Sequence, residues 1–247
     1  MDFLIPVKID HPDRLRNLDI VIKYLNKCGY NNIYLAEHDS TPSLKDRYSN
    51  IKEYMFIDKQ EDKTFNKMKA FNDLFHLSES KAIALYDVDA IISKKDLNLA
   101  EKLINDNEAD VVYPYNGKFY DLPKVRVEEM FEDKLTKVDL SECTLFNLNS
   151  RGGVVVFNRQ IFKDGGMANE NFINVGYDDN EIAERFAILG YRIQLTPGVL
   201  IHLNHYRGDT SFNYNKHLKH NERLFIETSS CTKQQLLDKI KNWPWVK

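Results

Sequence analysis

The segment Ala82-Ile83-Ala84-Leu85-Tyr86-Asp87-Val88-Asp89 decides the predicted fold, because it joins a short apolar run directly to two carboxylates. Such a run, bounded by polar residues, is typical of a strand that is buried on both faces of a sheet. Acids that directly follow the strand project from the carboxyl edge of the sheet, where open α/β folds bind ligands. We therefore expect a layered α/β protein with a site at the end of this strand.

The sequence on either side alternates between strand-like and helix-like patterns. Further strands are predicted over 3–7, 33–36, 110–113, 152–157, 191–195 and 199–201. Helices are predicted over 13–28, 64–77 with Thr64 as its cap, 96–104, 181–189 and 232–240. This alternation predicts a mixed, mainly parallel sheet with helices on both faces. Residues 114–150 have no clear period, and we expect a functional loop region there.

Composition narrows the class of protein. The 247 residues include 34 Lys and Arg against 37 Asp and Glu, and this net charge of −3 disfavours a general nucleic-acid binder. No apolar run approaches the roughly 20 residues that cross a bilayer, and charges come too early for a signal peptide, so we expect a cytoplasmic protein. The three scattered cysteines indicate neither a disulfide framework nor a thiolate zinc site.

Asp87 and Asp89 suggest a metal site. Two close carboxylates repel each other unless a cation joins them, and a hard divalent ion that also contacts phosphates would remove that repulsion. Magnesium or manganese is the usual choice for oxygen ligands. The alternative is a turn without a ligand, since aspartate favours turns.

Other polar clusters add candidates. Asp178-Asp179-Asn180-Glu181 precedes a predicted helix, where acids are also expected simply from capping and the helix dipole. Gly152-Gly153 and Gly165-Gly166 would let a bulky ligand approach the backbone. His202 and His205 follow a strand at i, i+3 spacing, and one of them could complete a metal coordination sphere.

Six blocks of sequence, taken in order and spacing, resemble nucleotide-sugar glycosyltransferases of the GT-A fold, and more closely the galactosyltransferase and chondroitin-polymerase-like group. The blocks are Ile5-Pro6-Val7-Lys8, Phe65-Asn66-Lys67-Met68-Lys69-Ala70-Phe71-Asn72, Asp87-Val88-Asp89, Arg151-Gly152-Gly153-Val154, Gly176-Tyr177-Asp178-Asp179-Asn180-Glu181 and His205-Tyr206-Arg207. The resemblance implies a GT-A domain over residues 1–210, followed by a helical extension over 211–247 packed on it.

At matching positions the resemblance implies roles for individual residues. Asp179 would be the catalytic base, with Asp178 beside it contacting donor or acceptor sugar. Asp89 and His205 would bind the metal, with His202 as the alternative histidine. The implied nucleotide-sugar contacts are Pro6, Val7, Lys8, Arg14, Glu37, Lys69, Asn72, Asp87 and Gly153, of which Asp87 would face the ribose or the metal.

The implied function is a metal-dependent inverting glycosyltransferase that moves a hexose or N-acetylhexosamine from a UDP-sugar to an acceptor hydroxyl, with Mn²⁺ or Mg²⁺ as cofactor. Two departures concern the acceptor. The family's Glu-Asp pair reads Asp178-Asp179 here, and the tryptophan expected just upstream is replaced near Val175 or Tyr177. We therefore do not transfer an N-acetylglucosamine acceptor. The acceptor stays open between a lipid-linked or soluble glycan, a protein and a modified nucleic-acid base.

Two other functions compete with this one. A nucleotidyl- or phosphotransferase could use the same acidic metal site, although no glycine-rich phosphate loop follows the first strand. A nucleotide-sugar-binding module without turnover would retain the fold. The C-terminal Trp243-Pro244-Trp245 could contact a membrane interface, but we expect it to pack on the domain.

Overall fold

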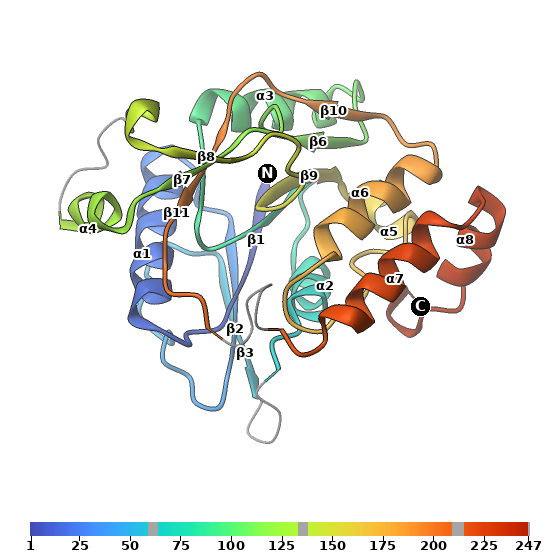
Figure 1. Cartoon of the computed structure of the whole chain (residues 1–247), viewed down its shortest axis with the longest axis horizontal. Coiled ribbons are helices and arrows are strands. Elements are labelled where there is room, and N and C mark those ends of the chain that lie inside the picture. Colours follow the sequence, from blue (N-terminus) through green and yellow to red (C-terminus); the bar gives the residue numbers. More distant parts are fainter. Residues whose placement is uncertain (59–63, 133–137, 209–214, 247) are drawn as a thin grey trace.

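The computed structural model describes residues 1–58, 64–132, 138–208 and 215–246. Its centre is a seven-stranded sheet in the order β10-β6-β9-β4-β1-β2-β3 (Figure 1). The strands are β1 (Asp2–Val7), β2 (Ile33–Asp39), β3 (Glu53–Asp58), β4 (Ala82–Tyr86), β6 (Val111–Tyr113), β9 (Val154–Asn158) and β10 (Ile193–Leu195). Strands β1 to β4 run parallel, and β9 is antiparallel to both of its neighbours. The prediction of a mixed, mainly parallel sheet is confirmed.

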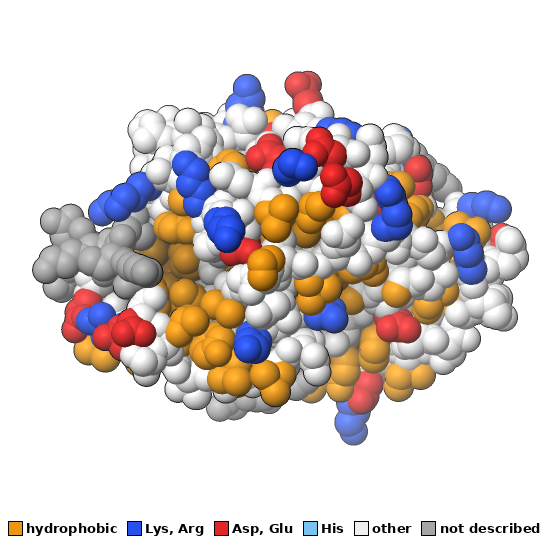
Figure 2. Space-filling model, turned by 90° about the horizontal axis from the view of Figure 1, so that it is seen from above, with side chains coloured by type: hydrophobic (Ala, Val, Ile, Leu, Met, Phe, Trp, Pro, Cys, Tyr) orange, Lys and Arg blue, Asp and Glu red, His pale blue; other side chains and the backbone are white. Residues whose placement is uncertain are grey.

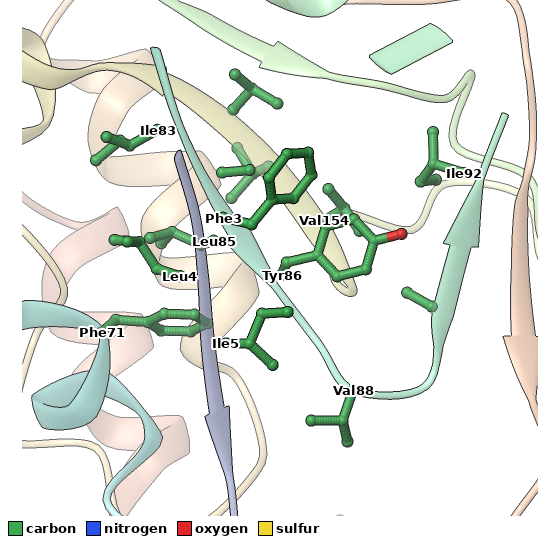
Figure 3. Packing of buried hydrophobic residues seen from close by; sticks show 14 of the residues in the cluster. Phe3, Leu4, Ile5, Phe71, Ile83, Leu85, Tyr86, Val88, Ile92 and Val154 are labelled. Atoms are coloured by element: carbon green, nitrogen blue, oxygen red, sulfur yellow. The ribbon is translucent and has the colours of Figure 1, made fainter. Parts of the chain in front are cut away.

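The core lies around the two central strands, whose residues are buried throughout. Paired residues of parallel strands point to the same face, so Leu4 and Leu85 meet Phe71 on one side of the sheet (Figure 3). Phe3 and Tyr86 lie on the other side with ring centres 5.6 Å apart. Burial on both faces explains why these strands read as continuous apolar runs.

Helices cover both faces of the sheet (Figure 1). One face carries α1 (Pro12–Lys27) and α3 (Lys94–Asn105), and the other carries α2 (Lys67–Leu77), α5 (Arg159–Asp164) and α6 (Asp178–Ile188). The predicted cap of α2 is wrong: the Asn66 side chain, not Thr64, accepts a hydrogen bond from the amide of Lys69. The amide of Phe65 is instead bound to Asn174 Oδ1, which ties the preceding residues to another loop.

A second sheet of four strands stands beside the first, in the order β5-β11-β7-β8. It comprises β5 (Ala90–Ile92), β7 (Phe119–Leu122), β8 (Thr144–Asn147) and β11 (Leu200–Leu203). The region 114–150, predicted as loop, supplies two of these strands as well as α4 (Lys124–Glu132) and the 3-10 helix η1 (Leu140–Glu142). Because β5 begins directly after Asp89, the Asp87–Asp89 segment is the corner where the chain passes from one sheet to the other.

The C-terminal part consists of α7 (Leu218–Ser229), α8 (Lys233–Ile240) and the 3-10 helix η2 (Pro244–Val246), and α7 packs along α6. Thr232 and Gln235 form the predicted capping box of α8. The predicted domain boundary at residues 210–211 lies outside the described residues. Trp245 Nε1 donates a hydrogen bond to the carbonyl of Gly166, so the tryptophan pair packs on the domain as expected.

The prediction that Gly165-Gly166 admits a ligand is wrong. A Cβ atom on Gly165 would lie 2.4 Å from the ring of Phe186, and Gly166, at φ +92°, has Trp243 against it. These glycines let the α5–α6 connection pack tightly against neighbouring aromatic rings. They serve the core, on the side of α6 that faces the C-terminal helices.

Other expectations concern the chain as a whole. Cys28, Cys143 and Cys231 are free thiols. Among the described residues, the helices include none with the length and apolar character needed to span a bilayer. On the face seen in Figure 2, Lys and Arg side chains are interspersed with Asp and Glu, so neither sign of charge dominates.

Candidate active site

A cleft of about 590 Å³ opens at the carboxyl edge of the central strands. It is bounded by the end of β1, the corner between the two sheets, β11 and the start of α6. Of the residues predicted for the site, those that line it are Pro6, Val7, Lys8, Arg14, Asp87, Asp89, Gly153, Asp179 and His205. Residues from six separated sequence blocks therefore meet in one cavity.

Asp89, His202 and His205 form a cluster that could hold a metal ion, with one ligand atom of each within 4.8 Å of the others. Asp89 Oδ2 lies 3.0 Å from His205 Nε2 and 3.8 Å from His202 Nε2. The fold brings them together because β11 pairs with β5, and the amide of Leu203 donates to the carbonyl of Asp89 at 2.7 Å. The sequence left the two histidines as alternatives, and the structure places both beside Asp89.

Both histidines point the same ring nitrogen at Asp89. His205 Nδ1 lies 2.6 Å from the carbonyl oxygen of Tyr206, and His202 Nδ1 lies 2.6 Å from Asp121 Oδ1. Because a carbonyl or carboxylate oxygen accepts, each Nδ1 is the donor, and each Nε2 is the ring nitrogen that faces Asp89 and could bind a cation. One carboxylate and two imidazoles suit Mn²⁺ better than Mg²⁺, which prefers oxygen ligands alone.

The start of α1 holds the histidine-bearing segment in place. Asn17 donates to the carbonyl of Leu203 at 2.7 Å, and Arg16 donates to that of Asn204 at 2.9 Å. The amide of Tyr206 donates to Asp13 Oδ2 at 2.9 Å. These hydrogen bonds hold the segment that follows β11 beside Asp89.

Arg14, predicted as a nucleotide contact, lies against the same cluster. Its Nη1 donates to Asp89 Oδ2 at 2.7 Å and is 3.4 Å from His205 Nε2. Burial would raise the pKa of Asp89, but His202, His205 and Arg14 outweigh burial and hold that pKa well below its usual range. Asp89 is therefore ionised, and a bound cation would share its carboxylate with the guanidinium or displace it.

Asp87 faces a second cluster, built around Lys67. The buried Lys67 ammonium lies 2.9 Å from Asp178 Oδ2, 3.5 Å from Asp179 Oδ1 and 3.6 Å from Asp87 Oδ1. Burial would lower the pKa of Lys67, but the three carboxylates outweigh it and raise the pKa well above its usual value. The two acids of the Asp-Val-Asp corner thus point to different partners.

Asp179 is the most exposed carboxylate of this second cluster, with 33% of its side chain exposed. Burial, with Asp178 and Asp87 nearby, raises its pKa to about 8 against the opposing effect of Lys67. The Asp178 side chain is 2% exposed, lies outside the cleft lining and accepts the amide of Gly176 at 2.8 Å. Gly152 makes room for the Asp179 carboxylate, since a Cβ there would lie 2.5 Å from Asp179 Oδ2.

Three predicted nucleotide contacts do not line the cleft. Glu37 is fully buried and closes the loop after β2, accepting the amides of Ser43 and Leu44. Lys69 pairs with Asp73 at 2.7 Å on the outer side of α2. Asn72 exchanges two hydrogen bonds with the backbone of Ala168.

Sequence reasoning missed several residues of the cleft. Lys67 belongs to the same sequence block as Lys69, the predicted nucleotide-sugar contact. The two lysines are two positions apart on the helix and therefore lie on different faces of it. Arg151 also lines the cleft. Phe119 and Phe146, whose ring centres are 5.8 Å apart, come from the 114–150 region that was expected to be functional.

Three solved structures with a similar fold are glycosyltransferases. The catalytic domain of Drosophila β1,4-galactosyltransferase 7 with xylobiose has 15% identity and a TM-score of 0.56, covering 96% of this chain and 82% of that one. Residues 1–349 of Staphylococcus aureus TarS with UDP-GlcNAc have 14% identity and a TM-score of 0.61, covering 98% and 72%. The mannosyltransferase PcManGT of Pyrobaculum calidifontis with GDP-Man and Mn²⁺ has 17% identity and a TM-score of 0.51, covering 84% and 57%.

These likenesses establish the fold. The chain has the GT-A fold of nucleotide-sugar glycosyltransferases, as the sequence blocks implied. No protein-family model and no curated protein matches the sequence.

Proposed function

We propose that this protein is a metal-dependent, inverting glycosyltransferase that moves a hexose or N-acetylhexosamine from a UDP-sugar to an acceptor hydroxyl. One observation carries the proposal: the Asp89 cluster and the Asp179 carboxylate line the same cleft. The similar structures with UDP-GlcNAc, or with GDP-Man and Mn²⁺, support a nucleotide-sugar donor. The structure with xylobiose supports a saccharide acceptor.

The donor would enter beside the end of β1. Pro6, Val7 and Lys8 line the cleft there, and Lys8 and Arg14 offer positive charge to a diphosphate. Asp89, His202 and His205 would hold Mn²⁺ or Mg²⁺, which would act as a Lewis acid on the departing diphosphate.

The acceptor would enter on the side of Asp179. As the bond from the anomeric carbon to the diphosphate breaks, the acceptor oxygen attacks that carbon and Asp179 takes the hydroxyl proton. Attack from the face opposite the leaving group inverts the anomeric configuration. Lys67 compensates the charge of the carboxylates around the base before and after this transfer.

The rim of the cleft beside the second sheet carries exposed apolar side chains. Phe146 is 68% exposed and lines the cleft, with Leu145 and Leu148 exposed beside it. Aromatic rings stack on the apolar faces of sugars, so the rim suits an acceptor glycan or another hydroxyl-bearing molecule with an apolar face.

The test is the release of UDP from a panel of UDP-sugars, with and without Mn²⁺ and with saccharide acceptors. We expect acceptor-stimulated release that EDTA abolishes, a product of inverted configuration by NMR, and loss of activity in Asp179→Asn. Tight donor binding without release would favour a binding module. Release of pyrophosphate or transfer of a phosphoryl group would favour a nucleotidyl- or phosphotransferase.

A further inference from the structure

The orientation of His202 depends on a residue from outside the cleft's own sequence blocks. In the second sheet, His202 of β11 is paired with Ala90 of β5 on one side and with Asp121 of β7 on the other. Side chains of directly paired residues lie on the same face of a sheet, so the Asp121 carboxylate stands beside the imidazole. The distance from Asp121 Oδ1 to His202 Nδ1 is 2.6 Å.

Both oxygens of Asp121 are engaged. Oδ2 accepts a hydrogen bond from Asn204 Nδ2 at 2.7 Å, and Asn204 follows His202 by two positions, one residue past the end of β11. The ring of Phe119 stacks on that of His202 with centres 5.2 Å apart. The His202 side chain is only 6% exposed, so the imidazole has little freedom to turn.

We propose that Asp121 is a positioning residue of the metal site, which holds His202 in the Nδ1–H form and directs Nε2 at the cation shared with Asp89. The inference rests on the proposed metal site. A carboxylate on the far nitrogen fixes the tautomer and increases the basicity of a metal-binding imidazole. Asp121 itself contacts neither metal nor substrate.

The two histidines differ in what orients them. His205 Nδ1 is bound to the carbonyl of the next residue, Tyr206, so its orientation comes from the local backbone. His202 relies on a side chain 81 positions away in the sequence. Of the two histidines, only His202 loses a direct contact when the Asp121 carboxylate is removed, and this distinguishes a positioning role from a general effect on the site.

The isosteric variant Asp121→Asn tests whether both oxygens of the carboxylate are needed. Two donors, His202 Nδ1–H and Asn204 Nδ2, meet the two carboxylate oxygens, whereas an amide offers only one oxygen. One donor is left facing an NH₂ group, and the network must rearrange. Glu142→Gln is the matched control, because it removes one negative charge from an exposed side chain that pairs with Arg126.

The experiment measures Mn²⁺ affinity of the full chain by calorimetry, without any sugar donor, and checks the fold of each variant by thermal unfolding. We expect Asp121→Asn to weaken Mn²⁺ binding by about 10- to 100-fold and Glu142→Gln to leave it unchanged. In a His202→Ala background, Asp121→Asn should cause no further loss. Long-range ¹H–¹⁵N spectra should show the Nδ1–H form of His202 in the wild type and a change in the variant.

An unchanged affinity in Asp121→Asn would overturn the inference, and so would an equal loss in the His202→Ala background. Absence of Mn²⁺ binding by the wild type would overturn it together with the metal site. Mn²⁺ binding that responds to Asp121 in a protein that transfers no sugar would refute the proposed function and leave this inference standing.

Discussion

The ammonium of Lys67 lies 3.5 Å from the carboxylate of Asp179, and the same ammonium also faces Asp178 and Asp87. One buried cation therefore balances three acids, of which Asp179 is the one proposed to accept a proton from substrate. The proton affinity of this base depends on how far Lys67 offsets burial and the two neighbouring acids. The dependence of the rate on pH is a direct measure of that balance.

The first prediction concerns this pH dependence. Asp179 acts as a base only when it is deprotonated, and its pKa is raised to about 8 by burial and the neighbouring acids. Below that pH the fraction of active base falls tenfold per unit, so kcat/KM should rise with pH and level off above about 8. Steady-state rates in buffers across this range check it. A rate that is constant from acidic to alkaline pH would show that Asp179 is not the base.

The second prediction removes the balancing cation. In Lys67→Met the pKa of Asp179 should rise further, because an opposite charge this close lowers a carboxyl pKa by about 1–3 units. The rising limb of the pH profile should move to higher pH by a similar amount. Lys69→Met is the control, since Lys69 pairs with Asp73 outside the cleft. Identical pH profiles in the two variants would show that Lys67 does not influence the pKa of the base.

The third prediction distinguishes the two acids of the Asp-Val-Asp corner. Among the described residues, the group of candidate metal ligands contains Asp89 and not Asp87, which faces Lys67 instead. Asp89→Asn should weaken Mn²⁺ binding by at least about 100-fold, more than the loss of a residue that only orients a ligand. Asp87→Asn should change it much less. A larger effect of Asp87→Asn in calorimetric titrations would reverse the assignment.

How far the fold could be predicted depends on how each element buries its residues. The central strands β1 and β4 have continuous apolar runs because both of their faces are covered, and the sequence places them correctly. β8 has four exposed residues and β7 is only partly buried, so neither shows an apolar run and the region was predicted as loop. The pairing of β7 with β11 is a long-range contact that no local pattern reveals.

In the site, too, the features that could be predicted are local in the sequence, and those that could not depend on long-range contacts. Asp89, Asp179 and His205, to which the sequence blocks point, all line the cleft, because each lies at one end of a recognisable element. Lys67 was missed because buried lysines are rare, so nothing local indicates that its ammonium turns inward to three acids. The partnership of His202 with Asp121 depends on strand register across 81 positions, which the sequence does not display.

The fourth prediction concerns stability. Arg185 and Glu181 form a fully buried ion pair on α6, and Arg185 also donates to the carbonyl of Met167. Arg185→Leu leaves the Glu181 charge buried without its partner, which should cost about 3–5 kcal/mol of unfolding free energy. Arg192, which is exposed and pairs with Asp110, is the control, and Arg192→Leu should cost much less than Arg185→Leu. Urea unfolding of both variants measures the difference, and equal losses would contradict it.

The fifth prediction uses two glycines to separate catalysis from stability. Gly152 does not have a positive φ, so its backbone accepts alanine, but the new Cβ would lie 2.5 Å from Asp179 Oδ2 and push the carboxylate away. Because displacement of a catalytic group by about 1 Å can cost about 100-fold in rate, Gly152→Ala should lower kcat with little change in melting temperature.

For Gly190 we expect the reverse, a loss of stability without a loss of activity. Gly190 follows the C-cap of α6 at φ +84°, and among the described residues an added Cβ would have Lys233 Nζ as its one neighbour within 4 Å. Gly190→Ala should cost about 1 kcal/mol of stability through backbone strain and leave kcat unchanged. Stopped assays and thermal melts of the two variants test the pair together. If Gly152→Ala keeps full activity, the Asp179 carboxylate does not act from the position it occupies beside Gly152, and the base must be sought elsewhere along the cleft.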